Sequence, residues 1–284
     1  MNTARKAVLS EYMSSYKYQF ILLVMLTAGV YSTIIWEMVK QWYDDPNYSH
    51  GFIVPLMSGY FAYERRADLK KTEVSPSNSG LFIVIFGLLM LIVGYVGTEY
   101  FTMRSSLIVV LAGMVLYFFG IEAGKKLLLP IVFLFFMVPL PAIVYNSFAF
   151  PLKLLVAKYS VLFLQAIGVV VVREGNILMF PAIVLEVADA CSGMRSLMSL
   201  LALGVGIAFL TQRAAWKKWV VSLSAIPIAI VTNAVRVIIT GILAQYWGEK
   251  AAEGFFHEFA GLAIFGFAMV LLAGVAVVMR RLPR

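Results

Sequence analysis

The stretch that decides the fold is GLFIVIFGLLMLIVGYVG, residues 80–97, where no charged side chain interrupts 18 consecutive positions. A helix rises about 1.5 Å per residue, so roughly 20 residues cross a hydrocarbon core of about 30 Å. The whole chain shares this character, because 62% of its 284 residues are hydrophobic and only 13% are charged. Soluble domains carry about 25% charged residues to cover their surface. The sequence therefore predicts an integral membrane protein.

Further apolar stretches lie on both sides of this one. The expected spans are about 19–39, 51–63, 80–97, 105–121, 127–146, 194–211, 217–246 and 258–279. No small-residue cleavage site follows the first, so we interpret it as a retained anchor and not as a signal peptide. Pro139-Leu140-Pro141 must kink or end the fifth. The predicted fold class is an all-α polytopic membrane protein of about eight transmembrane helices, forming one domain over residues 1–284.

The basic residues predict how the chain is oriented. Clusters stand before the first span, after the second, between the fourth and fifth, between the sixth and seventh, and at the end of the chain. All fall on one side if the spans alternate, and the positive-inside rule assigns that side to the cytoplasm. The basic residues lie between the apolar runs and do not form a continuous basic surface. Membrane topology therefore explains the net charge of +8 better than a nucleic-acid partner does. We expect a multi-pass protein of the cell inner membrane with both termini in the cytoplasm.

If the eight spans alternate in this way, residues 147–190 form an insert that begins and ends on the outer, periplasmic side. Residues 151–168 are apolar but carry Lys153, Lys158 and Gln165, which favours an amphipathic or re-entrant helix at the outer surface. Residues 169–187 are rich in β-branched side chains, and Glu174-Gly175-Asn176 between them is a turn signal. That pattern predicts a small β-hairpin.

A thiol is the first candidate for chemistry at the outer face. Cys191, in DACSGMRS over 189–196, is the single cysteine, which excludes an internal disulfide and a CxxC site. It stands just before an expected helix, whose N–H groups and dipole favour a thiolate. The alternative is a buried cysteine that only fills space. His257, at the outer start of the last span, could accept the thiol proton, as in thiol proteases.

An arginine inside an apolar run is the second candidate. Arg236 closes NAVR over 233–236 in the outer half of the seventh span. Such a residue costs roughly 2.5–3.5 kcal/mol on insertion scales, so it usually serves function. Arg236 could stabilise an oxyanion or hold the substrate. The alternatives are snorkelling to the interface or a structural pair with Asp189 or Glu186.

The outer loop between the first two spans is the third candidate. It reads WYDDPNYSHGFIVP over 42–55 and contains the other histidine, His50. Asp44, Asp45 and Asn47 could bind peptide or a divalent cation. The alternative is an aromatic belt with a turn around Pro46.

These motifs together resemble the exosortases, the bacterial branch of the exosortase/archaeosortase family. The resemblance rests on DPNYSHGFIVP (45–55), ACSGMRSL (190–197), NAVR (233–236) and Phe256-His257, in that order. It implies a membrane-embedded cysteine protease or transpeptidase that acts on membrane-anchored proteins with a C-terminal PEP-CTERM-like tail of short motif, transmembrane helix and basic cluster. By this resemblance Cys191 matches the nucleophile, with Arg236 and His257 as its catalytic partners.

Several polar residues near these motifs are candidates for substrate binding. They are Asp45, Asn47, His50, Asp189, Arg195 and Asn233. No glycine-rich phosphate loop, HExxH or paired metal cysteines occur, so neither a cofactor nor a metal is expected. The rival class is a transporter or a subunit of an exopolysaccharide export system, because polar residues in spans and a broken helix fit that class too.

Overall fold

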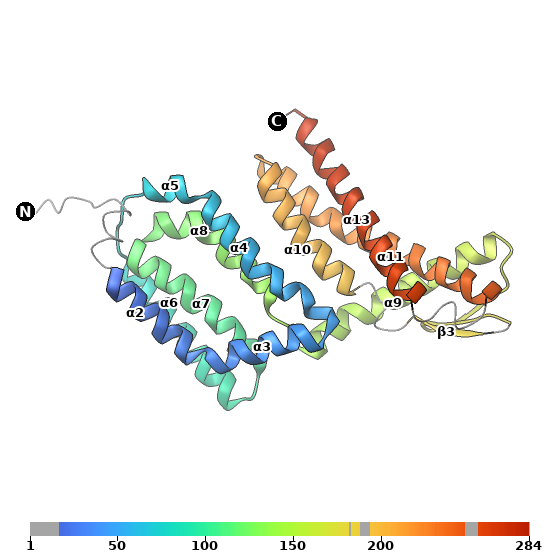
Figure 1. The fold of residues 1–284 in the computed structure, drawn as a ribbon, viewed down its shortest axis with the longest axis horizontal. Helices are drawn as coiled ribbons and strands as arrows, with labels where there is room; N and C mark the ends of the chain where they lie inside the picture. Colours follow the sequence, from blue (N-terminus) through green and yellow to red (C-terminus); the bar gives the residue numbers. More distant parts are fainter. Residues whose placement is uncertain (1–16, 182, 188–193, 248–254, 284) are drawn as a thin grey trace, which may run out of the picture. The chain divides into compact units, whose positions relative to one another are not determined.

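The computed structural model describes residues 17–181, 183–187, 194–247 and 255–283. The chain divides into two compact units, unit 1 (Met1–Pro141) and unit 2 (Ala142–Arg284). The boundary falls directly after Pro139-Leu140-Pro141. Each unit is built mainly from helices (Figure 1). We describe the two units separately.

Helix length and composition decide which helices could cross a membrane. Five helices of the described ranges are long and apolar enough: α6 (Asn78–Val96), α7 (Tyr100–Phe119), α9 (Ala142–Ala166), and most of α11 (Ala215–Trp247) and α13 (Phe255–Arg281). The bent pair α2 (Lys17–Val30) and α3 (Ser32–Asp44) would make a sixth. The polytopic helical class is thus confirmed. Other expected spans are shorter helices: α4 (Ile53–Glu64), α8 (Ile121–Phe133) and α10 (Met194–Thr211).

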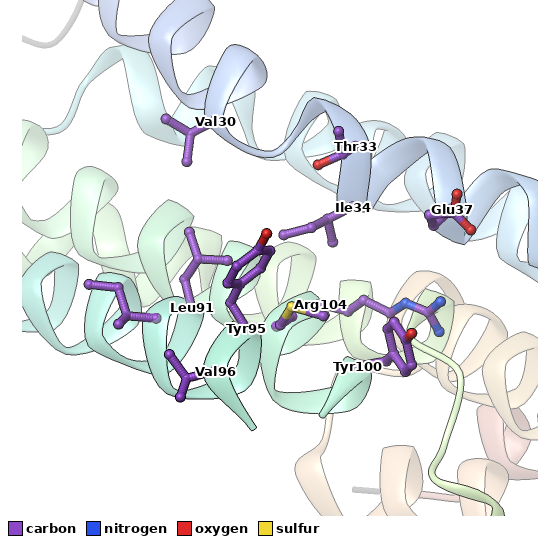
Figure 2. A pocket seen from close by; sticks show the side chains of 11 residues that line it. Val30, Thr33, Ile34, Glu37, Leu91, Tyr95, Val96, Tyr100 and Arg104 are labelled. Carbon is purple, nitrogen blue, oxygen red and sulfur yellow. The ribbon is translucent and has the colours of Figure 1, made fainter. Parts of the chain in front are cut away.

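The first expected span is broken. α2 and α3 meet at 62° around Tyr31, where the hydroxyl of Ser32 bonds the carbonyl of Gly29. Tyr31 is 1% exposed and its hydroxyl lies 2.9 Å from that of Ser106 in α7. The bend therefore has a buried polar anchor. Between α3 and the ends of α6 and α7 lies a cavity of about 370 Å³ (Figure 2).

Helices α6 and α7 form a closely packed hairpin because small residues line one face of α6. Gly80, Gly87 and Gly94 repeat at seven-residue spacing and are buried. A Cβ at Gly80 would lie 2.2 Å from the backbone nitrogen of Tyr117 in α7, so only glycine fits. Small residues at helix interfaces let backbones approach in this way in membranes.

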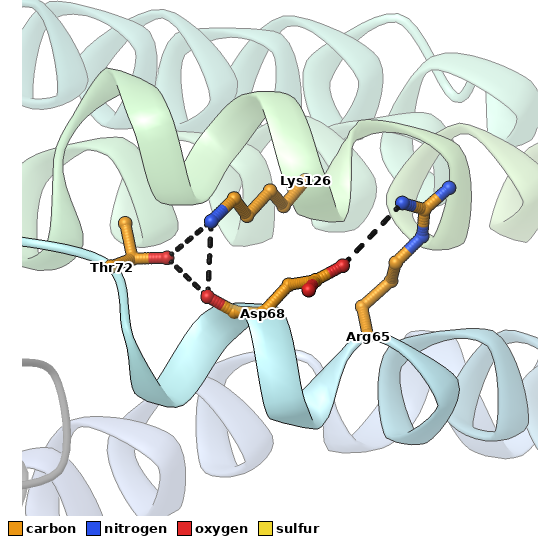
Figure 3. A network of polar contacts seen from close by, with 4 residues as sticks. All are labelled: Arg65, Asp68, Thr72 and Lys126. Atoms are coloured by element: carbon orange, nitrogen blue, oxygen red, sulfur yellow. Dashed lines mark hydrogen bonds and ion pairs between the residues drawn. The ribbon is translucent and has the colours of Figure 1, made fainter.

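The remainder of unit 1 surrounds this hairpin with short elements. The 3₁₀ helix η1 (Pro46–Phe52) leads into α4, and α5 (Arg66–Lys70) follows α4. Lys126 of α8 holds the end of α5, because its ammonium donates to the carbonyl of Asp68 at 3.0 Å and to the hydroxyl of Thr72 at 2.8 Å (Figure 3). Arg65 lies 3.9 Å from the carboxylate of Asp68.

The fifth expected span, about 127–146, differs from the structure. α8 ends at Phe133, a short 3₁₀ helix η2 (Leu134–Met137) follows, and the chain is non-helical until α9 begins. The physical reason is that Pro139 and Pro141 lack the N–H groups that a continuing helix needs. α9 then runs 25 residues through Pro151 to Ala166 and meets the length and composition of a span. The outer-surface assignment of 151–168 and the orientation of the chain stay predictions.

The predicted β-hairpin is confirmed and is extended by a third strand. β1 (Val172–Glu174), β2 (Ile177–Met179) and β3 (Val184–Glu186) form an antiparallel sheet in the order β1-β2-β3. The β1–β2 turn falls at Gly175, whose φ of 61° suits glycine. The sheet packs against α9 and α11 through a buried cluster. That cluster contains Val156, Ala157, Val161, Leu164, Val171, Leu178, Phe180, Val187 and Val237.

Helices α10, α11 and α13 form the second core of unit 2. Their shared apolar cluster includes Leu200, Val221 and Leu272, each fully buried. Two polar clamps fix α13 to its neighbours: Gln212 donates to the carbonyl of Ala276 at 2.8 Å, and Lys217 donates to that of Leu282 at 2.7 Å. α11 is therefore the central helix of unit 2, since it contacts α9, α10 and α13 and shares a buried cluster with the sheet.

Candidate functional site

Arg236 lies on the face of α11 that meets α13. The end of its guanidinium adjoins the backbone of Gly261, since a Cβ added there would lie 3.3 Å from Nη2 and 3.5 Å from Cζ. Arg236 is partly buried, and Asn233, three residues earlier on the same helix, is 4% exposed. A side chain at Gly261 would compete with the guanidinium for space. Glycine at this position therefore leaves room for a cation between two apolar helices.

Position 257 is one helical turn before Gly261 in α13. Residues four apart lie on the same face of a helix, so position 257 is on the face that meets Arg236. The side chain of His257 lies outside the described residues, and its pairing with Cys191 stays a prediction. The position of Gly261 beside Arg236 nevertheless relates the motif NAVR in α11 to the motif Phe256-His257 in α13.

Cys191 and Asp189 lie outside the described residues, but the chain is anchored just before them. Val187 is 2% exposed, and its N–H donates to the carbonyl of Asn176 at 2.9 Å. It belongs to the same buried cluster as Val237, which follows Arg236 in α11. The last described residue before the thiol motif therefore packs in the same cluster as the residue that follows Arg236.

α10 begins at Met194, three residues after Cys191 in the sequence. Arg195 is exposed in its first turn, a position where the helix dipole favours acidic residues over basic ones. A bound carboxylate would offset this unfavourable placement. Its assignment to substrate binding, like those of Asp189 and Asn233, stays a prediction.

The loop motif of residues 42–55 forms its own cluster in unit 1. The Asp45 carboxylate accepts from the N–H of Asn47 at 2.9 Å and so caps η1, with Pro46 at its first position. The structure thus brings together Asp45, Asn47 and His50, the three candidates from this loop. Their part in substrate binding stays a prediction.

Three side chains of this loop bind the carbonyls that the proline break releases. In a helix the carbonyl of Met137 would accept from residue 141, but Pro141 has no N–H. The indole of Trp42 donates to that carbonyl at 2.9 Å instead. Tyr48 donates to the carbonyl of Leu140 at 3.4 Å, and Nε2 of His50 lies 3.1 Å from that of Phe136.

Gly51 is required beside this contact. A Cβ there would lie 2.5 Å from the ring of Trp42, so a larger residue would displace the indole. Burial lowers the pKa of His50 below its ordinary value, against the opposing effect of the carbonyls of Phe136 and Asn47. His50 is therefore neutral at pH 7 and donates through Nε2. The loop motif thus holds unit 1 together at its helix break.

The sequence interpretation missed a buried arginine in unit 1. Arg104 in α7 is 8% exposed and donates to the side chain of Gln41 in α3 at 2.6 Å. The signal was present, because an arginine stands at the start of the apolar run 105–121. Among the described residues, no group of three or more His, Cys, Asp or Glu side chains is placed to hold a metal ion.

Comparison with known families gives one clear match. A family model described as a transmembrane exosortase matches residues 42–274, which include the loop motif, the thiol motif, NAVR and His257. Comparisons with curated proteins and with solved structures gave no match.

Proposed function

The chain belongs to the transmembrane exosortase family, and we propose that it is a cysteine protease or transpeptidase of membrane-anchored proteins. The family membership supports a membrane-embedded role in protein sorting or processing. The substrate would end in a PEP-CTERM-like tail of short motif, transmembrane helix and basic cluster. Its cleavage site would meet Cys191 at the periplasmic face of the inner membrane. The observation that carries the proposal is the approach of Arg236 to Gly261, one turn from position 257.

Each residue has a defined role in the proposed mechanism. The thiolate of Cys191 attacks the scissile carbonyl, and the bond between the carbonyl carbon and the peptide nitrogen breaks. His257 takes the thiol proton and returns it to the leaving amine. Arg236 stabilises the negative charge on the carbonyl oxygen. Water, an amine or a hydroxyl then attacks the thioester, which releases the thiol.

The single cysteine makes a direct test possible. Any thiol-directed reagent on the purified chain reports on Cys191 alone. The pH dependence of alkylation should give a thiol pKa well below the ordinary value of about 8.5. His257→Ala should move that pKa back toward the ordinary value. An unshifted pKa in the unaltered chain would refute activation of the thiol.

Processing of a tagged tail substrate provides the second test. Cys191→Ala and Cys191→Ser should leave the substrate at full length, whereas the unaltered chain should shorten it. Arg236→Lys keeps the charge but loses the planar fork, so it should process slowly, and Arg236→Ala more slowly still. Normal processing by both cysteine variants would contradict the proposal. It would favour a transporter or export subunit, which should tolerate loss of the thiol.

A further inference from the structure

The cavity of unit 1 has two chemically different ends. Figure 2 shows Glu37, Tyr100 and Arg104 at one end and Val30, Leu91 and Val96 at the other. Its volume of about 370 Å³ is within the usual range for small-molecule sites, about 300–1,000 Å³. A ligand that fits must combine an apolar chain with a polar head.

The apolar end of the cavity borders the outward face of α6. Only 17% of the α6 span is buried within the chain, so most of that helix faces outward. Ile92 and Val96, which line the cavity, are themselves exposed, as is the neighbouring Val93. In a bilayer this surface contacts lipid. An acyl chain could therefore enter the cavity sideways from the hydrocarbon core.

The polar end carries two opposite charges that are not paired with each other. Arg104 is held by Gln41 at 2.6 Å and lies 5.6 Å from the centre of the Tyr100 ring. Glu37 is exposed in α3 and interacts electrostatically with Arg104. Among the described side chains these two form no ion pair within 4.0 Å. A head group with one anion and one cation would complement both.

We propose that this cavity binds one phospholipid of the phosphatidylethanolamine class. The phosphate lies at Arg104, where a guanidinium matches its geometry, and the primary ammonium lies at Glu37 and the hydroxyl of Thr33. One acyl chain follows the apolar wall past Ile34 and Leu91. An anionic phosphatidylglycerol would place no cation against Glu37, so the site should discriminate against it.

Native mass spectrometry of the full chain in detergent, titrated with synthetic phosphatidylethanolamine or phosphatidylglycerol, measures this preference. The unaltered chain should bind phosphatidylethanolamine about ten-fold more tightly, which is the effect of one charge-assisted hydrogen bond. Arg104→Gln should weaken both lipids about ten-fold. Glu37→Gln should remove the preference and leave phosphatidylethanolamine binding closer to that of phosphatidylglycerol.

Two further variants separate the cavity from general surface effects. Ile34→Trp fills the apolar wall and should weaken both lipids without changing their ratio. Arg66→Gln is the matched control, because Arg66 stacks on Tyr63 at 3.6 Å and does not line the cavity. It should bind both lipids normally. Monodisperse elution and unchanged helical circular dichroism establish that each variant is folded.

Three results would overturn the proposal. Equal or tighter binding of phosphatidylglycerol by the unaltered chain would refute the head-group assignment. An unchanged lipid ratio in Glu37→Gln would refute the role of that carboxylate. Unaltered affinity in both Arg104→Gln and Ile34→Trp would show that the lipid binds elsewhere. None of these results depends on thiol chemistry, so they leave the proposed protease function unaffected.

Discussion

Replacing Gly261 by alanine is expected to damage the site while sparing the fold. The new Cβ would lie 3.3 Å from Nη2 of Arg236, closer than ordinary van der Waals contact. Because that nitrogen is the far end of a flexible side chain, the guanidinium should give way by a few tenths of an ångström. A displacement of 1 Å at a catalytic group can cost about 10²-fold in rate. A shift of about 0.3 Å then corresponds to about four-fold, or about 0.8 kcal/mol of activation free energy.

Stability should change in the opposite direction. Alanine in a helix interior is favoured over glycine by about 0.8–1.0 kcal/mol, so Gly261→Ala should unfold at an equal or higher temperature. Gly266→Ala and Gly274→Ala are matched controls on the same helix, because a Cβ at either position meets nothing within 4 Å. They should gain similar stability and keep full activity.

The assay combines the rate of tail-substrate processing in vesicles with thermal unfolding of the purified variants. Gly261→Val should process more slowly than Gly261→Ala, because its branched side chain displaces the guanidinium further. If Gly261→Ala processes as fast as Gly266→Ala, then Arg236 does not act from its place beside Gly261. If it loses activity only in proportion to folded protein, the loss is structural and the reasoning also fails.

Two further predictions concern the loop motif. Trp42→Phe removes the donor to the carbonyl of Met137 and should destabilise the chain by about 1–3 kcal/mol. The control Trp36→Phe, at a side chain that is 67% exposed, should not destabilise it. Equal melting temperatures of the two variants would contradict this prediction. His50 has a lowered pKa when folded, so the unfolded chain binds more protons and stability should fall as pH drops below about 6.5. His50→Gln can still donate to Phe136, so stability measured between pH 7.5 and 5 should depend less on pH, and an unchanged dependence would refute the assignment.

The sequence by itself determined the class of the protein and the residues worth testing. A charge-free stretch over 80–97 requires a membrane or a deep core, and 62% hydrophobic residues leave only the membrane. The turn at Gly175 was visible because glycine adopts positive φ at little cost. The motifs around Cys191, Arg236 and His257 were visible because polar residues are expensive in apolar runs.

Only the tertiary structure decided which residues meet. Periodicity does not show that α8 stops at Phe133, or that the carbonyl of Met137 finds a donor in Trp42, nearly a hundred residues earlier. Nor does it show that Gly261 makes room for Arg236, or that Arg104 and Glu37 share one cavity. Local patterns report the cost of placing each residue in lipid. Which partner offsets that cost depends on contacts between distant segments, and those exist only in the folded chain.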